Sequence, residues 1–409
     1  MSNILMLSAH ATRIDRRIVA EANALADSGR SVTLVSVPAA VEQGLLDGRV
    51  ELVLCSSQDL QGLGWRRRFV EKGKTLLKAW PWFYQVQKRL YRASGGWKRA
   101  GAAEVLVRRC PTAAYDVIHC HDLDTLPAAV QLKREIAPGA KIIYDSHELW
   151  PYQVKDKAFQ EYWKGVETSL IGQTDRVITV NDSIARQMVE FYAIAMPAVV
   201  YNSHEAAGPP AAVTGEEFLG HFAVPKGGLN VLYQGNIGPE RNLENLVAAF
   251  AELGTDVRLL MLGEGELARS LKAACARKGI ANVFFAPPVS QTRLLGFTRL
   301  ADMGIIPYTD DGILNNRFCT PNKLFEFIAA GVPVCASDLP ELRKIVKDQG
   351  IGEVYPMGSA RQIASAVEDC LSRRQKGEFT AASMQAAQEK YSWVRQRQAL
   401  LKVYQELGV

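Results

Sequence analysis

NILMLSAHATRIDRRIVAEANALADSGRSVTLVSV (residues 3–37) carries the pattern that sets the fold. Two short apolar runs, at residues 3–9 and 31–37, enclose Asp15–Ser28, where apolar side chains recur at helical spacing. A strand, a helix and a second strand in this order form a βαβ unit. Such units build parallel sheets because the helix crosses over between neighbouring strands. The stretch therefore predicts an α/β protein.

The same alternation continues toward the C-terminus. Further strands are predicted at residues 50–56, 115–121, 141–147 and 175–181. Asn181 or Ser183 is placed to cap the helix that follows the last of them. These strands and helices make one doubly wound, Rossmann-like domain, which we assign to residues 1–204. Residues 205–228 contain GPPAAVTG and PKGG, which is the composition of a linker.

A second Rossmann-like domain is predicted over residues 229–385. Its strands fall at residues 230–236, 257–265, 282–287, 302–308 and 332–337, and its first helices lie near Leu243–Leu253 and Glu266–Lys278. The last segment, residues 386–409, contains YSWVRQRQALLKVYQEL and reads as an amphipathic helix. We expect the two domains to face a central cleft and the C-terminal helix to pack back on the first domain.

Composition narrows the class of protein. The chain has 409 residues, enough for two or more domains, and its 48% hydrophobic and 22% charged residues are typical of globular proteins. Its seven Cys include no CxxC pair, which argues against a disulfide framework or a thiolate zinc site and favours a reducing compartment. The N-terminus lacks a signal-peptide pattern, and no apolar run reaches the roughly 18 residues of a spanning helix. We expect a cytoplasmic protein that is not integral to a membrane.

Residues 61–99 are strongly basic and rich in Trp. They hold eleven Lys and Arg against one acid, a net charge of +10 in a chain of net charge +5, so the remainder carries −5. Cations interleaved with Trp and Tyr suit an anionic membrane surface. Nucleic acid is a competing partner, and a solvated helix pair is the plain alternative. The residues that we assign to membrane docking are Trp65, Arg66, Arg67, Arg68, Lys72, Lys74, Trp80 and Trp82.

Three of the six His follow neighbouring predicted strands. His119 and His121 end one strand, and His147 follows the next. Together with nearby carboxylates they could form a metal site, but the remaining His do not continue a ligand pattern. The alternative is that one His contacts a substrate and the others are structural. We favour His121 for this contact because Asp122 is placed to start the next helix, whereas His119 packs inward.

In the second domain, two segments suit an anion. YQGNIGPERN places Gly235 between a strand and a helix, with Arg241 at the helix entry, and close backbone approach plus a cation can hold a diphosphate. In CTPNKLFEFIAAGVPVCASDLPEL, Lys323 lies near the amino end of a helix of about ten residues, which is a second anion site. Glu326, one turn further, could accept hydrogen bonds from a ribose diol.

The predicted ends of that helix rest on three residues. Thr320 can cap it, Pro321 suits its first position, and Gly331 can end it in the left-handed conformation.

The order of these segments resembles the retaining GT-B glycosyltransferases of family four over nearly the whole chain. The resemblance rests on YDVIHCHDLDTLPAA, IIYDSHELWP, TDRVITVNDS, YQGNIGPERNLENLV, PNKLFEFIAAGVPVCASDLPEL and the closing YSW helix. It implies that His121 lies beside the transferred sugar as the catalytic residue, that Glu326 binds the nucleotide ribose, and that Arg241 binds the diphosphate.

The chain departs from the family pattern at two positions. Asn236 stands where an Arg is expected, and Phe318 where a Glu usually contacts the donor sugar, so the sugar identity does not carry over. We assign the diphosphate to Gly235, Asn236, Arg241 and Lys323, and the donor sugar to the loop Asn316, Arg317, Phe318, Cys319 and Thr320. The candidate acceptor-side residues are Arg13, Asp15, Arg17, Asp122, His147 and Glu148.

The resemblance implies transfer of a sugar, with retention, from a nucleotide-diphosphate sugar to an acceptor hydroxyl. The acceptor is expected to be a lipid-linked saccharide in cell-surface polysaccharide or glycolipid synthesis. Cations would stabilise the leaving diphosphate without an obligatory metal or other cofactor. This activity favours an anionic membrane surface, at the inner face of the cell membrane, over nucleic acid as partner of residues 61–99.

Two alternatives remain open. A nucleotide-sugar 2-epimerase would use the carboxylates of Asp122, Asp145 and Glu148 to move a carbon-bound proton. A catalytically silent GT-B protein that binds carbohydrate or lipid would explain the departures at Asn236 and Phe318.

Overall fold

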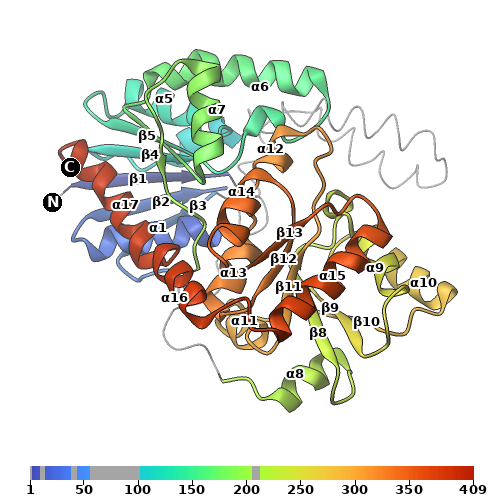
Figure 1. Ribbon diagram of the computed structural model, residues 1–409. Coiled ribbons are helices and arrows are strands. Elements are labelled where there is room, and N and C mark those ends of the chain that lie inside the picture. The colour runs from blue at the N-terminus through green and yellow to red at the C-terminus, as the bar shows by residue number, and fades with distance from the viewer. Residues whose placement is uncertain (1, 10–13, 38–43, 56–101, 205–211) are drawn as a thin grey trace, which may run out of the picture. The chain divides into compact units, whose positions relative to one another are not determined.

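The computed structural model describes residues 2–9, 14–37, 44–55, 102–204 and 212–409 (Figure 1). The chain divides into two compact units, unit 1 comprising Met1–Val200 with Arg397–Val409, and unit 2 comprising Tyr201–Gln396. Each unit has one parallel sheet flanked by helices. The predicted α/β class with two Rossmann-like domains is confirmed.

Unit 1 contains a seven-stranded sheet in the order β3-β2-β1-β4-β5-β6-β7. The strands are β1 (Asn3–Ser8), β2 (Ser31–Ser36), β3 (Val50–Leu54), β4 (Val117–His121), β5 (Lys141–Ser146), β6 (Arg176–Thr179) and β7 (Ala198–Val199). The central strands are almost wholly buried because helices cover both faces of a parallel sheet. The strands predicted from the sequence are confirmed, whereas β7 is too short to show a pattern.

The helices of unit 1 begin at polar caps. They are α1 (Arg16–Asp27), α5 (Leu126–Glu135), α6 (Lys157–Leu170), α7 (Asp182–Tyr192) and the greater part of α17 (Trp393–Glu406), with residues 102–109 also helical. Asp15 caps α1 and Asp156 caps α6. Asn181 caps α7 by accepting from the Ile184 N–H at 2.9 Å, which confirms one of the two predicted caps.

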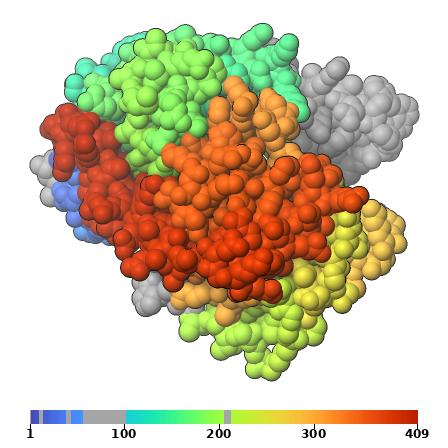
Figure 2. All heavy atoms as spheres, viewed as in Figure 1, coloured from blue at the N-terminus to red at the C-terminus, as the bar shows by residue number. Residues whose placement is uncertain are grey.

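Unit 2 contains a six-stranded sheet in the order β10-β9-β8-β11-β12-β13. The strands are β8 (Leu229–Gln234), β9 (Val257–Leu262), β10 (Val283–Ala286), β11 (Met303–Ile306), β12 (Val334–Ser337) and β13 (Gly352–Tyr355). The main helices are α8 (Gly215–Phe222), α9 (Leu243–Phe250), α10 (Ala268–Lys278), α11 (Gln291–Thr298), α13 (Asn322–Ala330), α15 (Ala360–Gln375) and α16 (Ala381–Lys390). Residues that follow β12 form much of the face of unit 2 seen in Figure 2, in orange to red.

The predicted linker at residues 205–228 is partly a folded element. Residues 205–211 lie outside the described ranges, but α8 follows, and its Phe218 and Phe222 are buried in the core of unit 2. The Gly and Pro residues at the ends of this segment give it the composition of a linker, although it contains a short amphipathic helix with two aromatic residues on one face.

The C-terminal helix belongs mostly to unit 1, as predicted. From Arg397 onward the chain is part of unit 1, and there the Tyr404 hydroxyl lies 2.8 Å from His119 Nδ1. Arg30 donates to the Val409 carbonyl at 2.8 Å. Among the helices of the described ranges, none has both the length and the apolar composition for a membrane span.

Candidate active-site residues

Strands β4 and β5 bring the predicted His and Asp residues together at their carboxyl ends. His121 pairs in register with Asp145. Side chains two apart in a strand share a face, so His119 and His121 stack with ring centroids 4.4 Å apart. Both are buried, at 0% and 1% exposure. The expectation that His119 packs inward is confirmed, and His121 is buried as well.

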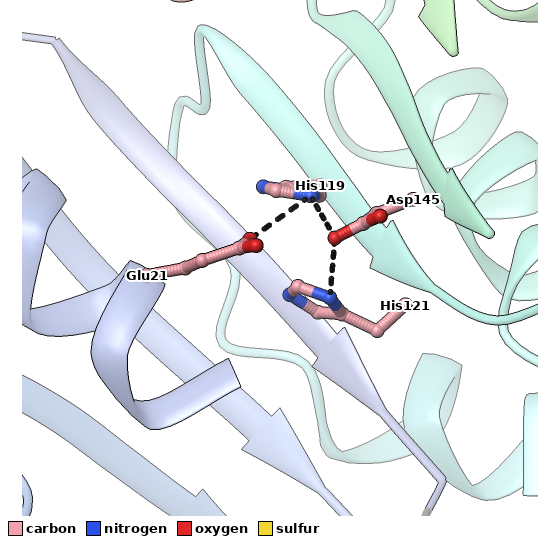
Figure 3. Close-up of side chains that lie close together, drawn as sticks. All are labelled: Glu21, His119, His121 and Asp145. Atoms are coloured by element: carbon pink, nitrogen blue, oxygen red, sulfur yellow. Dashed lines mark ion pairs between the residues drawn. The ribbon is translucent and has the colours of Figure 1, made fainter. Parts of the chain in front are cut away.

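Helix α1 supplies a buried cation, Arg17, and a second carboxylate, Glu21, to this site; of these two, Figure 3 draws Glu21, which extends from α1 toward His119. Arg17 holds Asp145 with two N–H groups, Nη2 at 2.8 Å from Oδ1 and Nε at 3.1 Å from Oδ2. Arg17 Nε also lies 2.8 Å from Glu21 Oε1. All three side chains are almost completely buried. A buried ion pair of this kind needs such multiple contacts to offset the cost of removing charges from water.

The two buried carboxylates of this cluster, Glu21 and Asp145, differ in their protonation. Burial, and then Asp145, raise the pKa of Glu21 to about 8 against the opposing effect of Arg17. Burial also acts to raise the pKa of Asp145, yet Arg17 and His147 outweigh it and hold that pKa well below its usual range. At neutral pH Asp145 is therefore the anion that balances Arg17, and Glu21 is largely protonated.

His147 lies between two carboxylates. Its Nε2 is 3.3 Å from Asp145 Oδ2 and 3.3 Å from His121 Nδ1, and its Nδ1 is 3.8 Å from Asp122 Oδ2. Burial acts to lower the pKa of His147, but Asp122 and Asp145 raise it to about 9. His147 is thus an imidazolium at neutral pH, whereas burial, followed by His119, lowers the pKa of His121.

Asp122 does not start a helix as predicted. It adopts a left-handed conformation with φ of 65°, and α5 begins four residues later at Leu126. The turn instead aims the Asp122 carboxylate at the next strand end, where Oδ1 accepts from the His147 N–H at 3.2 Å.

Four side chains of this cluster are of types that bind metal ions. The ligand atoms of Glu21, His119, His121 and Asp145 all lie within 4.8 Å of one another. However, the Arg17 guanidinium already contacts both carboxylates. A metal ion would have to displace this guanidinium, so the donor set does not fit an ion in the present arrangement.

The remaining predicted acceptor-side residues are dispersed. Arg13 lies outside the described residues, Asp15 caps α1, and Glu148 is exposed. Arg17 is 4% exposed and is occupied by Asp145. Their assignment to the acceptor stays a prediction. Among them, Arg17 has the surroundings of a cation that stabilises the fold.

In unit 2, the loop after β8 is exposed to solvent, and the backbone of the loop after β9 lies close to it. Gly235 has φ of 108°, in the region that favours glycine, and both Gly235 and Asn236 are exposed. A Cβ on Gly263, in the loop after β9, would lie 2.0 Å from the Gly235 carbonyl oxygen. The two loops therefore pack so tightly that glycine is needed where they meet, and their edge faces solvent.

Two cations flank one tyrosine beside this loop. Lys323 Nζ lies 2.7 Å from the Tyr308 hydroxyl and 4.4 Å from the ring centroid of Tyr233. The Arg241 guanidinium lies 4.8 Å from the ring centroid of Tyr308. A Cβ on Gly235 would lie 3.6 Å from Lys323 Cε. Three of the four residues assigned to the diphosphate thus come together, while Asn236 follows Gly235 in the same loop.

The start of α13 differs from the prediction. Pro321 occupies the N-cap position and no side chain caps the helix, so Thr320 is not the cap. Proline has no N–H and fixes φ, which suits it to the position before the first turn. Gly331 ends the helix with φ of 73°, as predicted.

Glu326 is buried and hydrogen bonded from the sheet. Its Oε2 accepts from Gln234 Nε2, and Gln234 Oε1 accepts from the Thr298 hydroxyl at 2.9 Å. Sequence reasoning missed Gln234, although a polar residue at the end of an otherwise apolar strand was an available signal. This series of hydrogen bonds fixes the orientation of the Glu326 carboxylate.

The predicted donor-sugar loop makes contacts within unit 2. Arg317 is half-exposed, with Nε 3.8 Å from Asp310 Oδ2 and its guanidinium 5.8 Å from the ring centroid of Phe318. Asn316 donates to Asp311 at 3.3 Å, and Cys319 packs against the unit 2 core. The membrane-docking residues Trp65, Arg66, Arg67, Arg68, Lys72, Lys74, Trp80 and Trp82 lie outside the described residues.

Comparison with known proteins gives matches along most of the chain. Residues 15–204 match the family described as Glycosyltransferase Family 4, and residues 216–390 match Glycosyl transferases group 1. The phosphatidyl-myo-inositol mannosyltransferase of Mycobacterium leprae is 24% identical over 310 residues, covering 72% of this chain and 74% of that protein. The D-inositol 3-phosphate glycosyltransferase of Acidothermus cellulolyticus is 27% identical over 319 residues, covering 71% and 67%.

Solved structures share the fold at low sequence identity. Sucrose-phosphate synthase from Thermosynechococcus elongatus matches with a TM-score of 0.71 and 17% identity, covering 100% of this chain and 99% of that one. Anabaena HepE in complex with UDP-glucose matches with a TM-score of 0.70 and 14% identity, covering 99% and 100%.

Proposed function

Because this chain belongs to the glycosyltransferases of group 1 and family 4, we propose that it is a retaining transferase that uses a nucleoside-diphosphate sugar. The acceptor that we propose is the hydroxyl of a lipid-linked saccharide. The cluster of Lys323, Arg241 and Gly235 at the carboxyl edge of the unit 2 sheet carries this proposal.

The chemistry of the leaving group explains why this cluster matters. When the glycosidic bond to the diphosphate breaks, negative charge grows on the phosphate oxygens. Fixed cations near a helix start and exposed backbone N–H groups stabilise that charge without reorganising. Lys323 suits this task because its hydrogen bond goes to the Tyr308 hydroxyl, and within the described residues no carboxylate lies at ion-pair distance from its ammonium.

We propose roles for two further residues, Glu326 in unit 2 and His121 in unit 1. Glu326, held by Gln234, accepts hydrogen bonds from the ribose hydroxyls, and His121 contacts the transferred sugar. The HepE complex with UDP-glucose supports a nucleoside-diphosphate sugar as donor. No metal ion is needed in this scheme, because protein cations neutralise the diphosphate.

The lipid-linked acceptor and the place of action rest on two observations. The matched mannosyltransferase acts, by its name, on phosphatidyl-myo-inositol, which is a lipid. Residues 61–99 combine a net charge of +10 with several Trp, a composition that favours an anionic membrane surface. We therefore place the protein at the inner face of the cell membrane as a peripheral protein.

The test is a calorimetric titration with UDP-, GDP- and other nucleotide sugars, followed by turnover assays with lipid-linked acceptors in the presence of EDTA. We expect one nucleotide sugar to bind and its sugar to be transferred with the anomeric configuration kept, as read by NMR of the product. Turnover of the free donor to its 2-epimer, or absence of nucleotide binding, would contradict the proposal.

A pair of variants locates the donor. Glu326→Ala is expected to weaken nucleotide binding by roughly tenfold or more, since hydrogen bonds to a buried carboxylate contribute about 1.5–3 kcal/mol. Glu368→Ala, on the exposed side of α15, is the matched control and should bind as the unmodified protein does. Equal affinities for both variants would remove Glu326 from the site.

A further inference from the structure

We propose that His147 is a positioning residue that holds His121 as a neutral imidazole with its proton on Nε2. His121 then acts as a hydrogen-bond donor to an oxygen of the transferred sugar and not as a base. The identity of that ligand rests on the proposed function, whereas the position of the proton on His121 does not.

The contact between the two imidazoles requires unlike partners. His147 Nε2 and His121 Nδ1 are 3.3 Å apart in hydrogen-bonding geometry. At this distance one nitrogen must carry the hydrogen and the other must offer a lone pair, because two N–H groups facing one another repel.

His147 is the partner that keeps its proton. Its Nε2 lies 3.3 Å from Asp145 Oδ2, and its Nδ1 lies 3.8 Å from Asp122 Oδ2, so each ring nitrogen lies near a carboxylate. The positive charge of Arg17 acts to lower the pKa of His147, but Arg17 is paired with Asp145. The pKa of His147, raised to about 9, agrees with an imidazolium that has N–H on both nitrogens.

His121 has the opposite environment. It is 1% exposed and its ring stacks on that of His119 at 4.4 Å, so a charge on His121 would be buried beside a second imidazole. A neutral His121 that accepts at Nδ1 must carry its one proton on Nε2.

The competing arrangement would make His121 a base. If His121 Nδ1 donated to Asp145, Nε2 would be a lone pair. Asp145 Oδ2 is 3.5 Å from His121 Nδ1, a longer separation than that to His147, and it already accepts from Arg17 Nε at 3.1 Å and Nη2 at 3.0 Å. The two contacts with Arg17 at this oxygen disfavour a further hydrogen bond from His121 Nδ1, which leaves His121 Nδ1 to accept from His147 Nε2.

The far side of the His121 ring lacks a protein acceptor. Across the described part of the chain, His121 Nε2 is buried and has no hydrogen-bond partner. A buried N–H without an acceptor costs about 1–3 kcal/mol. A sugar hydroxyl or ring oxygen that reaches Nε2 would accept this hydrogen bond and recover the cost.

The direct test is nitrogen-15 NMR of the full chain labelled at histidine, with His121 assigned from the signals lost in His121→Gln. We expect a proton on Nε2 and none on Nδ1 of His121 at neutral pH. A proton on Nδ1 would overturn the proposal. This measurement needs no substrate, so it stands apart from the success or failure of the transferase assignment.

The role of His147 is tested with two variants. His147→Leu offers no donor, and we expect kcat to fall at least tenfold with little change in KM for the nucleotide sugar. In His147→Gln the amide N–H can still donate to His121, so this variant should recover part of kcat and keep the Nε2 proton. His221→Gln, whose imidazole lies by the Pro287 carbonyl in unit 2, is the control and should match the unmodified protein.

Two outcomes of the variants count against the inference. If His147→Leu leaves both kcat and the His121 signals unchanged, His147 does not position His121. If kcat falls equally in His147→Leu and His147→Gln while the Nε2 proton remains in both, the loss comes from the charge of His147 and not from its hydrogen bond.

Discussion

The candidate sites of the two units hold their charged side chains in opposite ways. In unit 1, Arg17, Asp145 and His147 lie deep in the protein and face one another, so the positive and negative charges compensate locally. In unit 2, Lys323 contacts a tyrosine hydroxyl and two aromatic rings next to an exposed glycine loop. A compensated cluster fixes geometry, whereas a cation that has no carboxylate at ion-pair distance keeps its field available for an anionic ligand.

The largest effect should come from breaking the compensated cluster. Asp145→Asn leaves the Arg17 guanidinium buried without its anion, and we expect the free energy of unfolding to fall by about 3–5 kcal/mol in urea denaturation. Asp27→Asn, which removes the two surface ion pairs of Asp27 with Arg49 and Arg397, should cost less than about 1 kcal/mol because Asp27 is 41% exposed. Similar losses in both would mean that the unit 1 cluster contributes no more than a surface pair.

The pH dependence of stability should also come mainly from unit 1. The pKa values of Glu21 and His147 are raised to about 8 and about 9 from their ordinary values of 4.5 and 6.5. The proton that each group binds stabilises the folded state fully at pH values below the ordinary pKa. This stabilisation is lost as the pH rises through the raised pKa. Each contributes about 1.4 kcal/mol per pH unit within that window. Above neutral pH the unfolded chain has mostly released both protons, so stability should decrease.

We therefore expect the free energy of unfolding to drop by roughly 2–4 kcal/mol between about pH 7 and pH 9. Urea denaturation at several pH values measures it. The double variant Glu21→Gln with His147→Gln should flatten the curve in this range. A flat curve for the unmodified protein would show that these two groups do not hold raised pKa values.

In unit 2 the expected effect is on binding and not on folding. Lys323→Met keeps the apolar stem but removes the ammonium, and nucleoside-diphosphate affinity should fall by about 1.5–3 kcal/mol, or roughly ten- to a hundredfold, in calorimetry. Lys347→Met, which is half-exposed and pairs with Glu353, is the control within the same unit and should leave affinity unchanged. An unaltered affinity in Lys323→Met would show that the ammonium does not face the ligand.

The smallest effect separates the two carboxylates of unit 1. Glu21 is largely protonated at neutral pH, so Glu21→Gln replaces a neutral acid by a neutral amide of the same shape. We expect a loss below about 1 kcal/mol in the free energy of unfolding. A cost as large as that of Asp145→Asn would mean that Glu21 is ionised and shares the charge of Arg17.

Local sequence signals predicted the architecture well and some details poorly. Alternating apolar runs located the main strands, and Asn181 and Gly331 were identified because capping and left-handed conformations depend on a few adjacent residues. Thr320 and Asp122 were misjudged, since Pro321 occupies the cap and the chain turns sharply at Asp122. Strand β7 was missed because its two residues offer no pattern, and β13 because Gly352 and Glu353 interrupt its apolar run.

The residues of the candidate site follow the same division. The sequence alone proposed His121, Lys323 and Glu326 as candidates, because motif residues next to strands and helix starts are adjacent in the chain. The Arg17–Asp145 pair spans 128 residues and the Gln234–Glu326 bond spans 92, so these contacts appear only when parallel strands bring distant segments to one edge of a sheet. The charge states of these residues also depend on the folded chain. Burial and neighbouring charges, and not residue type, make the pKa of Glu21 differ from that of Asp145 and the pKa of His121 differ from that of His147.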